Sequence, residues 1–238
     1  MNNKTDNHEL SFLASNDYWG RGIMIGNTED QRITVAYFIM GRSVNSRNRY
    51  FYQEGDRVAI APYDKDKLED PSLIIYYPIK TVSDQLIVTN GDQTDTVEEY
   101  LNSGRSFEDA LRTRKFEPDE PHFTPRISGV IDTKTGDFKL SILKNIDGKG
   151  EACGRYFYEY APLPGTGRFI HTYEGNGNPL PTFEGEPWKV AIPNTLDEMT
   201  SQIWNSLNDD NKISLCTMII DPASGEREMK ILNKRMGD

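Results

Sequence analysis

Short apolar runs recur along the chain, and turn-forming residues separate them. The runs are rich in β-branched and aromatic residues, which favour strands. Several runs are apolar at consecutive positions, which is typical of strands covered on both faces. The pattern therefore predicts sheets with further layers packed outside them. In the first half of the chain, strands are expected at residues 23–25, 33–40, 58–61, 73–77 and 86–88.

Three segments carry the signals that start helices. Thr96-Val97-Glu98-Glu99 is a capping box and predicts a short helix that ends near Gly104. Ser106 is expected to cap a second helix over residues 107–116, and Thr195-Leu196-Asp197-Glu198 is another capping box. The third helix carries an apolar stripe, which predicts core packing. The stripe consists of Leu196, Met199, Ile203 and Leu207.

The second half of the chain returns to strands. They are expected at residues 127–132, 138–144, 156–160, 213–221 and 226–232. Strands outnumber helices, and the helices come in clusters, so the pattern is that of an α+β protein. Residues 1–17 are polar and are expected to form a loosely held tail. Because no linker divides the remainder, residues 18–238 are expected to form a single domain.

Composition narrows the classes of function. The chain has 238 residues and a formal net charge of −10, which argues against a nucleic-acid or membrane-surface binder. Two cysteines and three widely separated histidines give no disulfide framework and no zinc-binding spacing. There is no apolar run of about 20 residues and no signal peptide, so a cytoplasmic protein is expected.

One stretch is basic although the whole chain is acidic. Between Gln31 and Gln53 there are four arginines and no acid. The segment MGRSVNSRNR follows an apolar run, and its Gly, Ser, Asn and Arg residues are suited to an anion-binding loop. The alternative is a solvated loop whose arginines balance the acidic surface. The four arginines are Arg32, Arg42, Arg47 and Arg49.

Three further segments are rich in polar groups. Residues 89–96, TNGDQTDT, lead into an expected helix. The first N–H groups of that helix can bind an anion; the alternative is that residues 89–96 form an ordinary turn. Residues 116–126 place Glu117 and Asp119 among prolines, which either present an acid rigidly or form a linker. Residues 171–177 are interpreted as a lid or as a glycine-rich loop.

Six segments between about Tyr18 and Pro187 carry a resemblance to a known family. Together, and in this order, they resemble the archaeal-type inosine monophosphate (IMP) cyclohydrolases and their bacterial relatives. They are GRGIMIG, AYFIMGRSVNSRNRYF, DPSLIIYY, TNGDQTDT, FTPRISG and HTYEGNG. The resemblance implies the fold of the N-terminal nucleophile hydrolases, a four-layer αββα sandwich of two antiparallel sheets. It implies a hydrolase of purine biosynthesis that closes the ring of 5-formamidoimidazole-4-carboxamide ribonucleotide (FAICAR) to give IMP and water. The expected partner is that nucleotide substrate, with no metal or other cofactor and with a homo-oligomer left open.

The resemblance also implies roles for individual residues. Arg47, Tyr76 and Glu117 are expected to be catalytic, with Tyr77 and Asp119 left open as alternatives to the last two. Gln93 stands where some archaeal members carry His. Residues expected to hold the nucleotide are Arg21, Arg42, Ser43, Asn90, Thr94, Asp95 and Arg126.

Two other functions remain open at this point. One is an N-terminal-nucleophile-fold amidohydrolase that acts on another substrate. The segment Tyr18-Trp19-Gly20 argues against it, because it puts no Ser, Thr or Cys directly before the first strand. The other is a non-catalytic relative that binds purine nucleotides.

Overall fold

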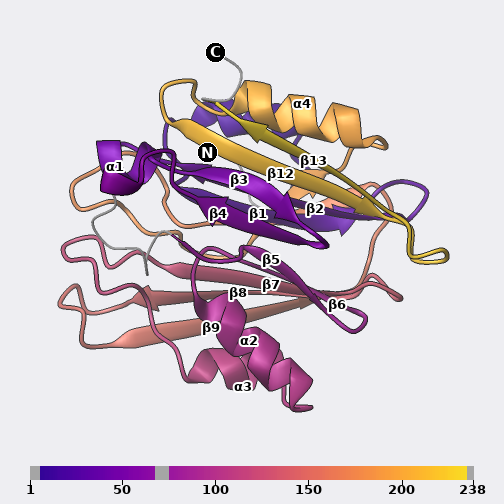
Figure 1. Ribbon diagram of the computed structural model, residues 1–238, viewed down its shortest axis with the longest axis horizontal. Coiled ribbons are helices and arrows are strands. Elements are labelled where there is room, and N and C mark those ends of the chain that lie inside the picture. The colour runs from indigo at the N-terminus through magenta and orange to yellow at the C-terminus, as the bar shows by residue number, and fades with distance from the viewer. Residues whose placement is uncertain (1–5, 68–74, 235–238) are drawn as a thin grey trace.

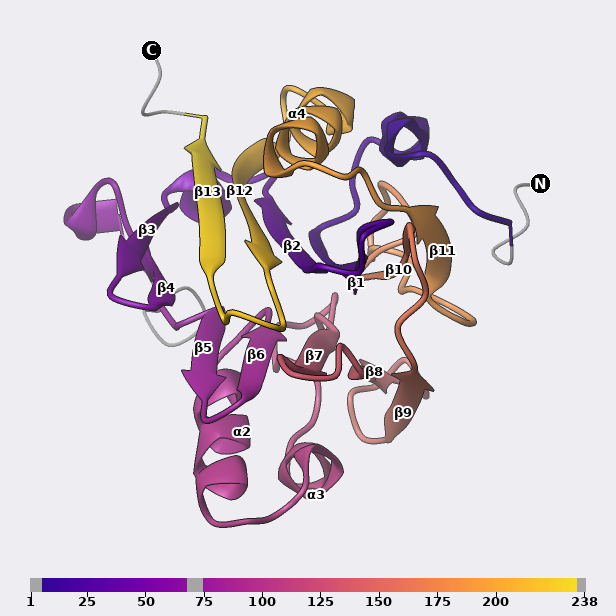
Figure 2. The ribbon, with the colours of Figure 1, turned by 90° about the vertical axis from the view of Figure 1, so that its right-hand side faces the viewer.

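Two antiparallel sheets form the centre of the molecule (Figures 1 and 2). The computed structural model describes residues 6–67 and 75–234. The six-stranded sheet has the order β11 (Trp188–Ala191), β10 (Thr166–His171), β1 (Arg21–Asn27), β2 (Ile33–Met40), β12 (Lys212–Ile220), β13 (Arg227–Asn233). The seven-stranded sheet has the order β3 (Tyr50–Glu54), β4 (Arg57–Ala61), β5 (Ile79–Val82), β6 (Gln85–Thr89), β7 (Arg126–Asp132), β8 (Phe138–Asn145), β9 (Cys153–Tyr160).

Helices lie outside both sheets, as Figure 2 shows end-on. The 3-10 helix η1 (Leu10–Ser15) and α4 (Leu196–Ser206) cover the six-stranded sheet. On the other side, α2 (Gln93–Asn102) and α3 (Phe107–Arg112) cover the seven-stranded sheet. Two short turns of helix, α1 (Val44–Arg47) and η2 (Lys65–Lys67), lie in connecting segments. The observed architecture is thus an α+β sandwich, as expected.

The central strands of the six-stranded sheet are buried on both faces. Every residue of β2 and of β12 is buried. One face of the sheet packs against the second sheet, and the other lies beneath α4 and η1. The prediction from the consecutive apolar runs, that these strands are covered on both faces, is therefore confirmed.

Side-chain hydrogen bonds join the two sheets at one edge. The amide of Asn233 on β13 accepts from the backbone N–H of Phe51 on β3 at 2.9 Å and donates to its carbonyl at 2.9 Å. The guanidinium of Arg227 on β13 donates to the hydroxyl of Thr81 on β5 at 2.7 Å. These bonds fix how the sheets lie against each other near the strands that lead into the site.

Four strands were absent from the sequence prediction: β3, β5, β10 and β11. The strand expected at residues 73–77 is wrong over the part that the structure describes. Residues 75–77 are irregular, and residues 73 and 74 lie outside the described residues. Pro78 follows and has no N–H to donate to a ladder, so β5 begins only at Ile79.

The helix starts were predicted with mixed success. Ser106 and Thr195 cap α3 and α4, accepting from the N–H groups of Asp109 and Glu198. The cap expected at Thr96 is wrong, because α2 already begins at Gln93. The N–H of Thr94 donates to the carbonyl of Gly91, so the first helical turn forms ahead of the capping box.

The expectation of a loosely held tail is wrong for the described part of residues 1–17. Leu10 and Leu13, three residues apart in η1, are completely buried. The indole N–H of Trp19 donates to the carbonyl of Leu13 at 2.8 Å. His8 forms a parallel bridge with Val190 of β11. The segment is therefore part of the outer helical layer.

Candidate functional site

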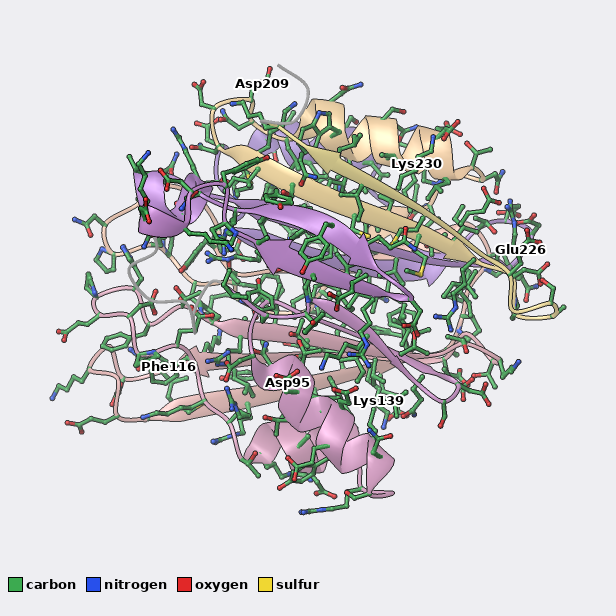
Figure 3. The ribbon with its side chains drawn as sticks, viewed as in Figure 1. Asp95, Phe116, Lys139, Asp209, Glu226 and Lys230 are labelled. Carbon is green, nitrogen blue, oxygen red and sulfur yellow. The ribbon has the colours of Figure 1, made fainter. Side chains whose placement is uncertain are left out.

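Charged and phenolic side chains gather at one end of the space between the sheets. Ile25 of β1 points at Gly129 of β7, so this face of β1 looks toward the second sheet. Arg21 lies on the same face because side chains alternate along a strand. Tyr37 of β2 pairs with Ile23 and shares that face. Phe116, labelled at the left-hand loop end in Figure 3, marks the loop that approaches from the other sheet.

Five residues form what we call the polar cluster: Arg21, Tyr37, Arg49, Tyr76 and Glu117. Arg21 and Tyr37 come from the six-stranded sheet. Arg49 and Tyr76 precede β3 and β5, and Glu117 lies in the loop before β7. Each of the five side chains acts electrostatically on at least two of the others.

Glu117 is the acid of this cluster and is only 4% exposed. Burial raises the pKa of its carboxyl to about 7, while Arg21 and Arg126 act in the opposite direction. Asp119 also raises this pKa, and its own oxygens accept from the backbone N–H and the hydroxyl of Thr124. A carboxyl that titrates near neutrality can both take up and release a proton during a reaction. Glu117 is therefore better placed than Asp119 for such a role.

Tyr76 is buried against Tyr37, and their hydroxyls are 2.8 Å apart. Burial raises the pKa of Tyr76, so its hydroxyl keeps its proton and can donate it in a hydrogen bond. Tyr77 points to the surface, where its hydroxyl donates to Glu54 at 2.8 Å. Of the two neighbouring tyrosines, Tyr76 is the one that belongs to the cluster.

Three arginines surround the acid and differ in their partners. Arg126 donates to Gln93 at 2.6 Å and to the carbonyl of Lys115 at 3.0 Å, and it pairs with Asp92 at 2.7 Å. Burial lowers the pKa of Arg49, and the charge of Arg21 lowers it further. For Arg21, burial also acts to lower the pKa, but neighbouring acidic groups, Tyr18 and Glu117 foremost, raise it overall.

The expected catalytic Arg47 does not point into the polar cluster. Its Nε donates to the carbonyl of Gly41 at 2.9 Å, and its Nη2 donates to the amide oxygen of Asn211 at 3.3 Å. The stretch around it contains no acid, and the two acceptors are a carbonyl and a side-chain amide. Arg47 thus ties the loop after β2 to the loop before β12.

Arg42 and Ser43 lie at the exposed start of α1. Arg42 stacks over the ring of Tyr18 at 5.0 Å and donates to the carbonyl of Gly177 at 3.1 Å. Ser43 caps α1, accepting from the N–H of Ser46 at 3.1 Å. Of residues 171–177, expected to be a lid or a glycine-rich loop, only His171 belongs to β10, and Asn176 and Gly177 accept hydrogen bonds from Arg42.

Asn90, Thr94 and Asp95 make hydrogen bonds and an ion pair within the fold and are not members of the polar cluster; their expected contact with the nucleotide stays a prediction. The amide of Asn90 donates to the carbonyl of Pro125 and accepts from Gln93 and from the N–H of Ile127. The hydroxyl of Thr94 bonds within the turn that starts α2. Asp95 is exposed on α2 (Figure 3). Its carboxylate pairs with Lys80 at 2.6 Å.

Sequence reasoning missed two members of the cluster, Tyr37 and Arg49. Tyr37 carries the one ionisable group of the β2 sequence ITVAYFIM, a signal that could have been noticed. Arg49 was counted in the basic stretch but was not distinguished from Arg47. No group of three or more His, Cys, Asp or Glu among residues 6–67 and 75–234 is arranged to hold a metal ion. Nor does this part of the chain contain a helix that is long and apolar enough to span a membrane.

Comparisons with known proteins agree with the resemblance seen in the sequence. Residues 18–225 match the family model of IMP cyclohydrolase-like proteins. An IMP cyclohydrolase of Methanopyrus kandleri is 29% identical over 180 residues, which is 70% of this chain and 89% of the relative. One from Methanosphaera stadtmanae is 32% identical over 167 residues, which is 67% of this chain and 75% of the relative. With its polar cluster formed by segments that lie inside the matched region, the chain belongs to the IMP cyclohydrolase-like family.

Proposed function

We propose that this protein is an IMP cyclohydrolase, which converts FAICAR into IMP with loss of water. The relatives that carry this name support the activity. The single structural observation that carries the proposal is Glu117, a buried carboxyl with a pKa of about 7 beside Arg21 and Tyr76. A ring closure of this kind needs proton transfer and stabilisation of an oxyanion, and these groups supply both.

The first half of the reaction forms a carbon–nitrogen bond within one molecule. The carboxamide nitrogen attacks the formyl carbon, and the electron pair of the formyl C=O bond moves to oxygen. Holding the two groups in contact removes much of the entropic barrier. The ionised Glu117 takes the proton that the nitrogen loses, and the hydroxyl of Tyr76 donates a hydrogen bond in the same region.

The second half removes water. Glu117 returns its proton to the oxygen, which becomes a hydroxyl group. That hydroxyl leaves as water with the hydrogen of the former formamide N–H, and a carbon–nitrogen double bond forms. One residue thus acts first as base and then as acid, which suits a pKa of about 7.

The phosphate of the nucleotide is assigned to Arg42. Its guanidinium is exposed, and both of its hydrogen bonds, to Gly177 and Asn176, use the same nitrogen, Nη1. A planar guanidinium is suited to phosphate oxygens. Substrate binding would then join α1 to the loop after β10.

We further propose that the sandwich is of the N-terminal-nucleophile-hydrolase type. Its two antiparallel sheets with helices outside each of them support this assignment. β1 begins at Arg21, directly after Trp19 and Gly20, so no Ser, Thr or Cys stands immediately before the first strand. A purified chain cleaved to begin with Ser, Thr or Cys would instead favour an amidohydrolase, and its intact mass would show this.

The deciding experiment is incubation of the protein with FAICAR while the ultraviolet absorbance of IMP is followed. We expect IMP to form faster than in the uncatalysed control. We also expect kcat/KM to rise with pH through about 7, as Glu117 becomes able to accept a proton. Absence of turnover above the control would exclude the proposed activity.

A further inference from the structure

Two guanidinium nitrogens in the polar cluster are buried without a hydrogen-bond partner. They are Nη2 of Arg49 and Nε of Arg21. Arg49 is only 1% exposed, and its Nε donates to the carbonyl of Ser46 at 3.0 Å. Within the described residues, no carboxylate forms an ion pair with either arginine.

Arg126 shows what a structural arginine looks like in the same region. It is also buried, but it pairs with Asp92, which it shares with Arg114, and Gln93 and the carbonyl of Lys115 accept from its N–H groups. Arg21 and Arg49 lack this arrangement. Their unused donors therefore do not serve the packing of the fold.

The charges of the cluster do not balance. Arg21 and Arg49 act on each other as like charges, and Glu117 is the only carboxyl in the polar cluster. Tyr37 and Tyr76 remain neutral, because burial raises the pKa of both hydroxyls. A buried cation without a counter-charge is costly, so this arrangement is suited to a bound anion.

We propose that Arg49, together with Arg21, binds the oxyanion that develops on the formyl group during ring closure. This inference rests on the proposed function. It differs from the role expected for Arg47, which donates from Nε to Gly41 and from Nη2 to Asn211. Arg49 is buried and interacts electrostatically with Tyr76 and Tyr37, whereas the phosphate is assigned to the exposed Arg42.

The two arginines act at one step of the reaction. When the carboxamide nitrogen bonds to the formyl carbon, the C=O electron pair moves to oxygen and creates a negative charge there. Nη2 of Arg49 and Nε of Arg21 are then the donors to that oxygen. The charge disappears when Glu117 delivers its proton and the oxygen leaves as water.

The product offers a direct test, because IMP keeps the phosphate but has lost this oxygen. We expect Arg49→Met to lower kcat at least ~100-fold, as for the loss of an oxyanion donor. The affinity for IMP, measured by calorimetry, should change less than about threefold. Arg49→Lys keeps the charge but not the planar fork, and we expect a loss of at least about tenfold. Arg32→Met is the matched control, since Arg32 pairs with Asp30 at the far end of β2, and it should leave turnover unchanged.

The melting temperature separates a catalytic from a structural role. Arg49→Met removes an unbalanced buried charge, so its melting temperature should not fall. A fall in melting temperature that parallels the loss of turnover would overturn the proposal. So would loss of turnover in Arg47→Met with none in Arg49→Met. Weakened binding of IMP with unchanged kcat would show that Arg49 holds the phosphate instead.

A final measurement does not depend on turnover. Formate is a small anion with the oxygens that the two arginines should bind, and it should raise the melting temperature of the wild type but not of Arg49→Met. If the wild-type protein does not convert FAICAR into IMP, the proposed activity is excluded. The formate measurement still decides whether the anion site exists. If formate raises the melting temperature of Arg49→Met as much as that of the wild type, the proposed anion site at Arg49 is wrong.

Discussion

At the scale of single residues, the burial that prepares Glu117 for proton transfer also weakens the fold. Its pKa is about 7 in the folded protein against an ordinary value of 4.5, so the folded state holds the extra proton between these pH values. The ionised carboxyl therefore destabilises the fold above pH 7, by about 3 kcal/mol for a shift of this size.

Glu117→Gln should abolish turnover and yet raise the free energy of unfolding at pH 8, by up to about 3 kcal/mol. The gain should shrink as the pH falls from 7 and vanish near 4.5, where both states are protonated. Denaturant titrations at several pH values measure it. Glu120→Gln, an exposed acid in the same loop, is the control and should change neither quantity. A destabilised Glu117→Gln at pH 8 would contradict the assigned pKa.

The neighbouring tyrosines provide a matched pair of variants. Tyr76→Phe removes the hydroxyl that lies 2.8 Å from that of Tyr37, and we expect kcat to fall at least about tenfold. Tyr77→Phe removes an exposed hydroxyl bonded to Glu54 and should leave kcat unchanged. Steady-state kinetics on both variants decide the matter. A large loss of kcat in Tyr77→Phe with none in Tyr76→Phe would mean that Tyr77, not Tyr76, is the catalytic tyrosine.

At the scale of elements, only one of the two capping-box sequences caps a helix. Thr195 caps α4, whereas Thr96 lies inside the first turn of α2, where its hydroxyl accepts from Arg114. Thr195→Ala should therefore lower the free energy of unfolding by about 1 kcal/mol. Thr96→Ala should cost less, and both should keep full turnover. Equal losses in urea titrations would mean that the box at Thr96 acts as a cap after all.

Elements with strong local patterns were predictable from the sequence. The run of β2 was identified to the residue, because eight consecutive buried positions need eight suitable side chains. β10 was missed because its sequence TGRFIH is half polar, and its pairing with β1 decides its structure. The start of α2 was misplaced because the buried turn at residues 89–94 begins the helix earlier than the capping box.

The site was predictable only where a motif pointed to it. Tyr76 and Glu117 came from the family resemblance, and both lie in the polar cluster. The sequence could not tell Arg47 from Arg49, because the difference lies in the backbone. The chain leaves α1 at Asn48, whose φ of −84° and ψ of 52° are not helical, so the two arginines point in different directions.

At the scale of the whole molecule, the first residues belong to the packed structure. Leu13 is completely buried between the outer layer and the six-stranded sheet. Leu13→Ala should cost about 2–5 kcal/mol of the free energy of unfolding, as for other core truncations. Ser11→Ala, at an exposed position of the same 3-10 helix, should cost little. A stability unaffected by Leu13→Ala in thermal or urea unfolding would restore the view of a loose tail.

The polar cluster draws Arg21 and Tyr37 from one sheet and Tyr76 and Glu117 from segments that enter the other. Neither sheet alone brings Glu117 and Arg21 together, so turnover requires that the two sheets are packed against each other. During refolding, the recovery of turnover therefore reports when the sheets pack together, even if each sheet has formed earlier.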